Sequence, residues 1–415
     1  MHILFLTHYF PPEVNAPASR TYEHAKRWVA DAQVAVTVVT NHPSHPKGVL
    51  FPGYRNRWLT IEKADGITVR RVKTFLAANA GIFRRTLNYL FFMVASIVGS
   101  LPVSKPDIVV ATSPQFFCSI AGYLVSLLKR RPFVFELRDI WPDSIVTVGA
   151  MKANPAIRLL EKLELFLYRR AVLIVVVTDS FRENLVGRGI PAEKIAVVKN
   201  GVDLDFFQPR QPSAGLAAKL GTTGKFVVSY IGTIGMAHAV DKIVETAELL
   251  RQQQDILFLI VGEGAKKQSV RDLIANKRLT NALLLEGANK QQVRDYYAIT
   301  DLNLVTLRNK PLFLMVIPSK IFEIMAMGRP ILSSINGESR QILEAGEAAE
   351  FVEPEDPERM AAAILRLKSD KEKLSRLGKN GRRFVEQNYN RDRSAAALLA
   401  YLKQITAARA REHAE

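Results

Sequence analysis

Short apolar runs alternate with longer amphipathic segments along most of the chain, and this alternation limits the possible folds more than any other feature. The clearest run is residues 173–177, where all five side chains are apolar and four are β-branched. The preceding residues 154–170 repeat their apolar positions at the spacing of an amphipathic helix. Strands that alternate with helices in this way predict βαβ units and parallel sheets. The expected fold class is therefore α/β.

The alternation stops once, near the middle of the chain, and then begins again. Residues 200–203 lead into a segment with two prolines and two glycines that ends at residue 221. A chain of 415 residues also exceeds the roughly 250–300 residues at which one core stops growing. These observations predict two facing, Rossmann-like, doubly wound domains with a ligand cleft between them. The expected boundaries are 1–199 for the first domain, 200–385 for the second, and 386–415 for a C-terminal helix that packs back on the first.

Positive charge is concentrated in the first half of the chain. The formal net charge is +17, and residues 1–200 hold 26 Lys and Arg against 14 Asp and Glu. Such a field favours an anionic partner, which could be nucleic acid, an acidic membrane or a phosphorylated substrate. The single cysteine, Cys118, excludes a disulfide framework and fits a reducing compartment. The apolar N-terminal run has neither a basic region nor a cleavage site, so it is interpreted as a first strand rather than a signal peptide.

Residues 318–330 predict a site for a diphosphate. Pro318 suits the first position of a short helix, and Gly328 suits its end. Lys320 adds a full charge to the N-terminal turn, where free backbone N–H groups and the helix dipole attract phosphate. Glu323 lies on the same face and could accept both hydroxyls of a ribose. The same Lys–Glu spacing also occurs in ordinary surface ion pairs, which remains the alternative.

Two glycine-containing turns follow predicted strands in the second half. Gly232, Ile234 and Gly235 follow the first strand, and these glycines would let a phosphate approach the backbone closely. Gly262 and Glu263 follow the next strand and are expected near a base or a ribose. Each turn could also be an ordinary connection between a strand and a helix.

Two loops of the first half follow predicted strands and are expected at the ligand edge of the sheet. One is residues 9–20, which is too long and polar for a simple turn. The other begins at residue 138, where Asp139 could orient or deprotonate an acceptor hydroxyl, or could pair with Arg138. The residues predicted to bind the acceptor are Tyr9, Pro12, Glu13, Asn15, Arg20, Arg138 and Asp139, and Asp139 is also predicted to be catalytic.

Six segments, in order and suitably spaced, resemble the family-4 retaining glycosyltransferases, in particular the subgroup that builds bacterial O-antigen, capsule and exopolysaccharide repeats. The resemblance covers nearly the whole chain. It implies the GT-B fold, with an N-terminal domain that binds the acceptor and a C-terminal domain that binds the nucleotide sugar. It also implies that cationic side chains and helix ends neutralise the leaving diphosphate without a metal or another cofactor. The segments are HYFPPE at 8–13, RDIWPD at 138–143, NGVD at 200–203, GTIG at 232–235, VGEG at 261–264 and PSKIFE at 318–323.

The chain departs from this family at one position. Members often carry a glutamate eight residues before the ribose-binding glutamate, where this chain has Met315. Recognition of the donor sugar is therefore expected from other groups, in the loop of residues 308–315. The only Asp-x-Asp, at 203–205, lies inside the linker motif and is not interpreted as a metal site. The predicted donor-binding residues are Gly232, Ile234, Gly235, Gly262, Glu263, Arg308, Ser319, Lys320 and Glu323, of which Lys320 and Glu323 are also predicted to be catalytic.

Residues 86–103 carry no charge and follow an arginine pair, Arg84 and Arg85. The run is slightly short for a membrane span, which takes about 20 apolar residues. It could be a buried crossover helix or a helix at a membrane interface. We expect a helix of the fold with one face at an anionic membrane, contacted by Arg84, Arg85, Phe91 and Phe92.

The expected function is transfer of a sugar from a nucleotide-sugar donor, with UDP implied by the resemblance, to a polyprenyl-diphosphate-linked saccharide. The expected location is the cytoplasm, with peripheral attachment to the inner face of the plasma membrane. One alternative is a nucleotide-sugar epimerase of the same fold. Another is a non-catalytic basic module that binds nucleic acid, which is disfavoured because the aromatic residues lie in apolar runs instead of between lysines and arginines.

Overall fold

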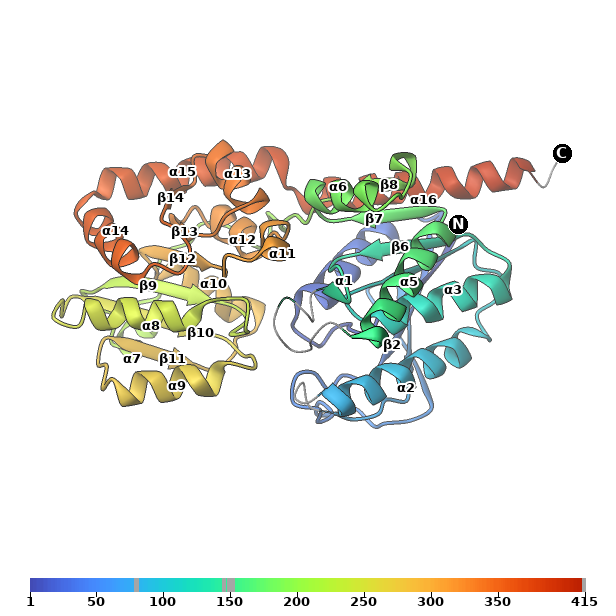
Figure 1. The fold of residues 1–415 in the computed structure, drawn as a ribbon, viewed down its shortest axis with the longest axis horizontal. Coiled ribbons are helices and arrows are strands. Elements are labelled where there is room, and N and C mark those ends of the chain that lie inside the picture. Colours follow the sequence, from blue (N-terminus) through green and yellow to red (C-terminus); the bar gives the residue numbers. More distant parts are fainter. Residues whose placement is uncertain (78–81, 144–146, 148–153, 413–415) are drawn as a thin grey trace. The chain divides into compact units, whose positions relative to one another are not determined.

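The computed structural model describes residues 1–77, 82–143, 147 and 154–412 (Figure 1). The chain divides into two compact units, one of Met1–Asn200 with Arg391–Glu415 and the other of Gly201–Asn390. Residues 413–415, at the end of the expected C-terminal helix, lie outside the described residues. Each unit is built around one sheet whose strands are mainly parallel.

The first unit contains an eight-stranded sheet in the order β3-β4-β2-β1-β5-β6-β7-β8. All of its pairs are parallel except the β3–β4 hairpin. The order reverses direction between β1 and β5, so the loops after these two strands flank the switch point where α/β sheets bind ligands. The strands are β1 His2–Leu6, β2 Ala35–Asn41, β3 Leu59–Ala64, β4 Ile67–Val72, β5 Ile108–Thr112, β6 Phe133–Leu137, β7 Leu173–Val176 and β8 Ile195–Val197, and the helices are α1 Ala16–Trp28, α2 Ile82–Ser100, α3 Phe116–Lys129, α5 Pro155–Arg170, α6 Asp179–Gly187, the short 3-10 helix Ala192–Lys194 and α16 Arg391–Glu412.

The second unit contains a six-stranded parallel sheet in the order β11-β10-β9-β12-β13-β14. Its switch point lies between β9 and β12. The strands are β9 Phe226–Ile231, β10 Ile256–Val261, β11 Ala282–Leu285, β12 Leu302–Thr306, β13 Ile331–Ser334 and β14 Ala349–Phe351, and the helices are α7 Ala214–Leu220, α8 Val240–Leu249, α9 Lys267–Asn276, α10 Lys290–Ala298, α11 Pro311–Leu314, α12 Lys320–Ala326, α13 Glu338–Ala345, α14 Pro357–Ser369 and α15 Lys371–Asn388.

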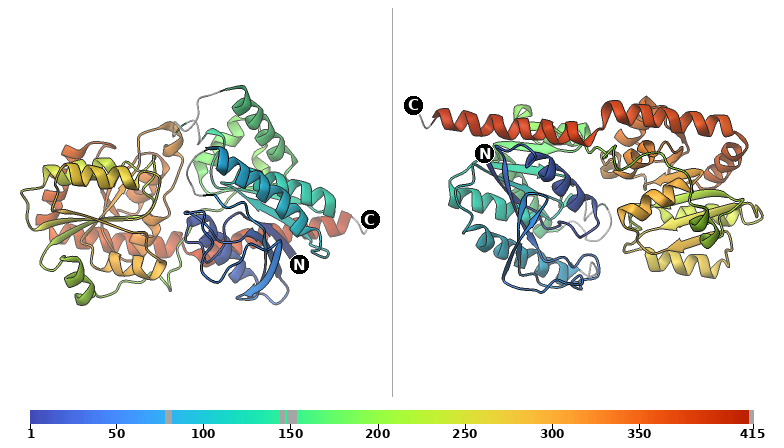
Figure 2. Two further views of the ribbon diagram at one scale, coloured as in Figure 1. Left: turned by 90° about the horizontal axis from the view of Figure 1, so that it is seen from below. Right: turned by 180° about the vertical axis from the view of Figure 1, so that it is seen from behind.

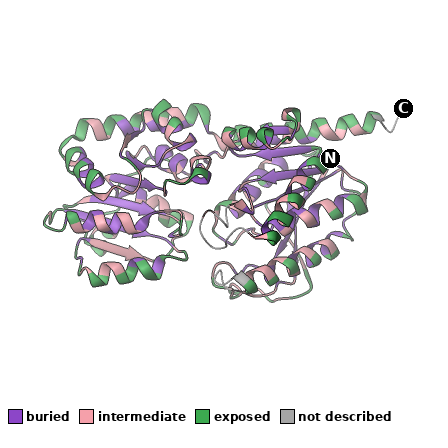
Figure 3. Cartoon of the chain, in the orientation of Figure 1, coloured by how far each residue is buried: buried purple, intermediate pink, exposed green. Residues whose placement is uncertain are grey.

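The central strands of both sheets are buried along their whole length, as Figure 3 shows in purple. All residues of β5, β6, β7 and β10 are buried. This is the pattern of parallel strands that helices cover on both faces, and it explains why these segments read as continuous apolar runs. The α/β class and the doubly wound architecture predicted from the sequence are therefore confirmed.

The last helix, α16, belongs to the first unit, where it packs on α1 (Figure 2). The indole N–H of Trp28 donates a 2.8 Å hydrogen bond to the carbonyl oxygen of Ala395. Leu398 and Leu402 are buried in the same core as β1 and β2. The helix therefore joins the chain's end to the unit that contains its beginning.

Two local expectations differ from the structure. The loop expected over residues 9–20 is shorter, because α1 begins at Ala16. Asn15 caps this helix by accepting a 2.9 Å hydrogen bond from the amide of Ala18, and Asn is a preferred residue at this position. The β3–β4 hairpin was not predicted, although Asp65 and Gly66 turn it with positive φ angles of 47° and 84°, a strong hairpin signal.

Candidate active site

Two glycine turns of the second unit pack directly against each other at the carboxyl ends of β9 and β10. A Cβ atom on Gly262 would lie 1.8 Å from the carbonyl oxygen of Gly232, and one on Gly264 would lie 2.3 Å from that of Ile234. The amide of Ile234 donates a 2.8 Å hydrogen bond to the carbonyl oxygen of Glu263. Only glycine permits this approach, so both turns predicted from the sequence form one backbone surface.

Lys320, the first residue of α12, extends its ammonium group to this surface. A Cβ atom on Gly232 would lie 2.8 Å from Lys320 Nζ. The nitrogen is buried, has no hydrogen-bond partner among the described residues, and lies 3.6 Å from the ring centroid of Tyr230. Burial lowers the pKa of Lys320 to about 7, although the charge of Glu323 partly opposes this.

A buried ammonium group without a hydrogen-bonded partner is costly, so such groups are normally paired or lose their proton. An anion at the glycine turns would supply the missing partner and would restore the charge of Lys320. The aromatic face of Tyr230 compensates only in part, because a cation–π contact is weaker than a charged hydrogen bond. The arrangement can therefore hold a phosphate group.

His238 lies beside the same turns. A Cβ atom on Gly235 would lie 3.1 Å from His238 Nδ1, and this nitrogen is buried with no hydrogen-bond partner in the described part of the chain. Burial and the nearby charge of Lys320 lower the pKa of His238 to about 3. The imidazole is therefore neutral and can donate or accept a hydrogen bond without adding charge.

The short helix α12 carries the other predicted donor residues. Ser319 is its N-cap, so Pro318 lies one residue before the cap and not at the first helical position that we expected. Gly328, with φ of 64°, follows the C-cap as predicted. Glu323 accepts a 3.4 Å hydrogen bond from the hydroxyl of Tyr297.

Two further predicted donor residues already have charged partners. The Arg308 guanidinium forms ion pairs with Asp241 and Glu355 at 2.8 and 2.7 Å. Glu263 forms a 2.8 Å ion pair with Lys267. Met315, which replaces the expected glutamate, is the C-cap of α11. Arg308 and Glu263 stay predictions as ligand contacts, and their observed contacts are structural.

In the first unit, the loop after β1 forms a polar group with the loop after β2. Glu13 is buried and accepts 2.9 Å hydrogen bonds from the amides of Ser44 and His45. Burial raises the pKa of Glu13 to about 7. The Tyr9 ring packs edge-on against His45. Pro12 lies between Tyr9 and Glu13 in the sequence. A small pocket is lined by His8, Tyr9, Asn41, Ser44, His45, Ala77, Arg85, Asn88 and Tyr89.

Three other predicted acceptor residues have different environments. Asn15 caps α1. Arg20 is buried and donates to Glu136, at 2.8 Å, and to the carbonyl oxygen of Val198, at 3.0 Å. The backbone amides of Arg138 and Asp139 both donate to Ser113 Oγ, which positions the loop after β6.

Of the four predicted membrane residues, Phe92 needs correction, and Arg84, Arg85 and Phe91 stay predictions. Phe92 is buried and packs edge-on against His8, with ring centroids 4.6 Å apart, so it faces the core. Arg85 lines the small pocket, where it donates a 3.3 Å hydrogen bond to the hydroxyl of Tyr89. Phe91 is partly buried and stacks on Trp58, and Arg84 is exposed. What we call the outer α2 face consists of side chains that are each at least 38% exposed: Phe83, Leu87, Leu90, Val94, Val98 and Leu101.

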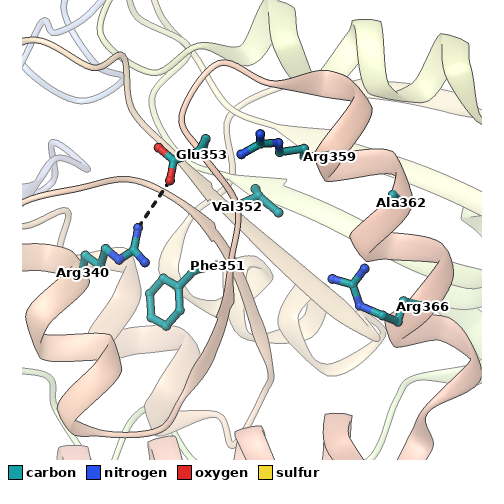
Figure 4. A pocket seen from close by; sticks show the side chains of 7 residues that line it. All are labelled: Arg340, Phe351, Val352, Glu353, Arg359, Ala362 and Arg366. Carbon is teal, nitrogen blue, oxygen red and sulfur yellow. Dashed lines mark ion pairs between the residues drawn. The ribbon is translucent and has the colours of Figure 1, made fainter.

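A further pocket of the second unit lies away from the glycine turns, at the sheet edge formed by β14 (Figure 4). Its arginines already have acidic partners, since Arg340 pairs with Glu344 and Glu353, Arg359 with Asp356, and Arg366 with Glu350. No uncompensated cation is left among these lining residues to hold an anion. The lining residues are Arg340, Phe351, Val352, Glu353, Arg359, Ala362 and Arg366.

The geometry agrees with what comparison with known proteins shows. Residues 15–201 match the family described as "Glycosyl transferase 4-like domain", and residues 216–384 match "Glycosyl transferases group 1". The chain is a glycosyltransferase. These two matches cover both units, and they confirm the enzyme class that the sequence motifs predicted.

Individual glycosyltransferases support the same assignment. The chain is 23% identical over 375 residues to "Putative colanic acid biosynthesis glycosyl transferase WcaI" of Escherichia coli (strain K12), covering 88% of this chain and 91% of the relative. The crystal structure of Anabaena Alr3699/HepE in complex with UDP and glucose superposes with a TM-score of 0.72 at 17% identity, covering 97% and 99% of the two chains. WaaG, a glycosyltransferase involved in lipopolysaccharide biosynthesis, gives 0.66 at 13% identity, covering 95% and 99%. The expected GT-B fold is confirmed.

Several residues of this glycosyltransferase's candidate site were missed in the sequence. Tyr230 is hidden inside an apolar strand, and no local pattern shows that its ring lies under Lys320. Tyr297 lies in α10 and meets Glu323 only through tertiary packing. His8 and His45 could have been suspected, because both lie in loops that follow strands, His8 next to Tyr9 and His45 next to Pro46.

Proposed function

We propose that this glycosyltransferase is a retaining enzyme that moves a sugar from a UDP-sugar to a polyprenyl-diphosphate-linked saccharide during synthesis of a bacterial surface polysaccharide. The observation that carries the proposal is the buried ammonium group of Lys320 against the glycine turns. A relative named for colanic acid biosynthesis and a structural neighbour solved with UDP and glucose support the choice of product and donor.

In the proposed reaction the bond between the donor sugar and its diphosphate breaks, and negative charge develops on the leaving phosphate. Lys320 stabilises this charge together with backbone N–H groups of the turn between Gly232 and Gly235. The amides of Gly232 and Ile234 are not among them, because they already donate to the carbonyl oxygens of Val261 and Glu263. The pKa of Lys320 is about 7, so part of the population is uncharged at neutral pH. The negative charge of a bound diphosphate raises this pKa and keeps the ammonium group charged. Neutral His238 can donate a further hydrogen bond, and Glu323 binds the ribose hydroxyls.

The acceptor is proposed to bind the first unit at the loops after β1 and β6. Asp139 orients or deprotonates the attacking hydroxyl, since its backbone is held by Ser113 at the end of a central strand. Tyr9 and Glu13 contribute the polar and aromatic surface that saccharides need. This assignment rests on the loop after β1, which flanks the switch point of the sheet. The loop after β6 is hydrogen-bonded to Ser113 in the loop after β5, which flanks the switch point on its other side.

The first unit is also proposed to attach peripherally to an anionic membrane, on the cytoplasmic side. The outer α2 face presents six apolar side chains, and the exposed Arg84 lies next to Phe83 at one end of it. Apolar side chains beside basic residues suit the boundary between lipid tails and headgroups. Among the helices that the structure describes, none is long and apolar enough to cross a bilayer.

Vesicle sedimentation tests this attachment. Val94→Ser combined with Val98→Ser should reduce binding to anionic vesicles strongly without lowering Tm, because both side chains are exposed. Leu249→Ser is the matched control, since it removes an exposed apolar side chain from the second unit. Binding of the double variant at the wild-type level would contradict the assignment of the outer α2 face to the membrane.

The identity of the donor nucleotide is tested by measuring Tm with UDP, GDP, ADP and their sugars. A ligand that binds only the native state raises Tm. UDP and UDP-sugars should raise Tm most. Product analysis with a lipid-linked saccharide should then show transfer with the anomeric configuration of the donor retained. Release of a rearranged nucleotide sugar in the absence of any acceptor would instead indicate an epimerase.

Catalysis is proposed to need no divalent metal. In the described part of the chain, no three His, Cys, Asp or Glu side chains gather where they could hold a metal ion. Turnover should therefore persist in excess EDTA. Loss of turnover with EDTA, followed by rescue with magnesium or manganese, would contradict this part of the proposal.

A further inference from the structure

A largely buried cluster of charged and titratable side chains lies in the first unit. Arg20 and His24 come from α1, Arg138 follows β6, and Arg391 begins α16. Two carboxylates accompany them. Glu136 pairs with Arg20 at 2.8 Å, and Glu23 pairs with Arg391 at 2.5 Å. Each of these two arginines thus has its own carboxylate, whereas Arg138 has none within ion-pair distance among the described residues.

The hydrogen bonds of the cluster confirm that Arg138 differs from Arg20. Arg20 directs its three guanidinium nitrogens to Glu136, Asn200 and the carbonyl oxygen of Val198. Arg138 Nε and Nη1 are buried and have no hydrogen-bond partner in the described part of the chain. A structural arginine is normally satisfied as Arg20 is, because an unpaired buried donor is destabilising.

The electrostatic surroundings point the same way. Burial, together with the charges of Arg20 and Arg391, lowers the pKa of Arg138 to about 9, although the charge of Glu136 opposes this. Burial and the neighbouring arginines also hold the pKa of His24 well below its usual value, so His24 is neutral. An anion in contact with Arg138 would reverse this local excess of positive charge.

The position of Arg138 makes such contact accessible to a ligand. Arg138 directly follows β6, at the edge of the sheet where α/β proteins bind their ligands. Ser113 Oγ accepts a 2.7 Å hydrogen bond from the Arg138 amide, so the loops after β5 and β6 hold the residue in place. Arg138 is partly buried as a residue, although its Nε and Nη1 atoms are buried.

We propose that Arg138 anchors a phosphate-binding subsite of the first unit, which takes the diphosphate group of the acceptor. The inference rests on the proposed function, since it assumes an acceptor that carries a diphosphate. A planar guanidinium with several donors matches two phosphate oxygens at once, which an ammonium group cannot do. Neutral His24 lies in the same cluster and is available to donate through Nε2, which has no partner among the described residues.

Binding of inorganic pyrophosphate to the full chain tests the subsite directly. The measurement is made by calorimetry in the Lys320→Ala background, so that the other expected phosphate site does not contribute. Arg138→Gln should weaken pyrophosphate binding at least tenfold, and Arg138→Lys should weaken it less, because it keeps a charge. Arg182→Gln, which removes an exposed arginine from the same unit, should leave the affinity unchanged.

Steady-state kinetics with Lys320 intact identify the source of the diphosphate. A raised KM for the lipid-linked acceptor in Arg138→Gln, with an unchanged KM for the nucleotide sugar, supports the acceptor. A raised KM for the nucleotide sugar alone would move the subsite to the donor diphosphate and overturn the assignment to the acceptor.

Unchanged pyrophosphate affinity in both Arg138 variants, with a lowered Tm, would show a structural arginine and overturn the proposal. If Arg138→Gln does not fold, Arg138→Lys gives the same two comparisons. Pyrophosphate binding does not require turnover, so its failure is distinguishable from failure of the proposed function.

Discussion

Lys320 and Arg308 of the second unit were both predicted to bind the donor, but only Arg308 is paired with carboxylates of the fold. The Arg308 guanidinium is paired with Asp241 and Glu355, and its charge is neutralised within the fold. The Lys320 ammonium group is buried against Gly232 with no hydrogen-bond partner among the described residues. A charge that the fold has already compensated stabilises the fold, whereas one left uncompensated at a glycine turn is available to an anionic ligand.

The largest expected effect concerns turnover. Lys320→Ala should lower kcat about 100-fold, since loss of one preorganised contact to developing charge costs roughly 3 kcal/mol. The measurement is initial-rate transfer of labelled sugar at saturating donor. Lys225→Ala is the matched control. This exposed lysine precedes β9, at the amino-terminal end of the strand, whereas the glycine turn follows its carboxyl end. If Lys320→Ala keeps more than half of the wild-type kcat, Lys320 does not stabilise the leaving phosphate, and the proposed difference between Lys320 and Arg308 is wrong.

The next effect is on the pH dependence of stability. Burial lowers the pKa of Lys320 to about 7 in the folded chain, against an ordinary value of 10.5. Below pH 7 both states hold the proton and the burial penalty is fully present; above pH 7 only the unfolded chain holds it, so stability rises with pH. Between pH 6 and pH 9 this amounts to roughly 2–3 kcal/mol.

Lys320→Met lacks that titration. The variant should therefore be more stable than the wild type at pH 6, and the advantage should shrink by pH 9. Urea unfolding at the two pH values measures both free energies. An advantage of equal size at pH 6 and pH 9 would mean that Lys320 does not titrate in this range.

Replacing Arg308 should lower the stability of the fold and leave donor binding nearly unchanged, and the change in stability should be smaller than the one at Lys320. Arg308→Gln removes two ion pairs that are partly exposed and therefore screened, at a cost of about 1 kcal/mol in the free energy of unfolding. Its affinity for UDP should stay within about twofold of the wild type. If calorimetry instead shows a large loss of affinity with unchanged Tm, Arg308 also belongs to the donor site.

The smallest effect is expected at Glu323. Glu323→Gln keeps the shape of the side chain but weakens the proposed hydrogen bonds to ribose, so UDP affinity should fall roughly fivefold, or about 1 kcal/mol. Glu358→Gln, at an exposed position in the same unit, controls for the loss of charge. Equal UDP affinity in the two variants would contradict the assignment of Glu323 to the ribose site.

Local sequence patterns predicted the type and the approximate bounds of several secondary-structure elements of this chain correctly. The apolar run at residues 173–177 forms the strand β7, Leu173–Val176, and the amphipathic segment 154–170 forms the helix α5, Pro155–Arg170. These predictions succeed because a parallel strand buried on both faces must be apolar along its length. The glycines at 232, 262 and 264 were also recognisable, since only glycine tolerates the backbone approach that brings their turns together.

Tertiary structure decided what each charged or aromatic side chain contacts. Arg20 was predicted to face the acceptor, but Glu136 lies 116 positions further along the chain and pairs with it inside the fold. Phe91 and Phe92 are neighbours in sequence, yet Phe92 is buried against His8 while Phe91 stacks on Trp58. Periodicity shows that a helix has two faces, but which face is covered depends on elements that are distant in sequence. The same reason separates Lys320 from Arg308, because whether a cation is compensated depends on carboxylates that only the folded chain brings to it.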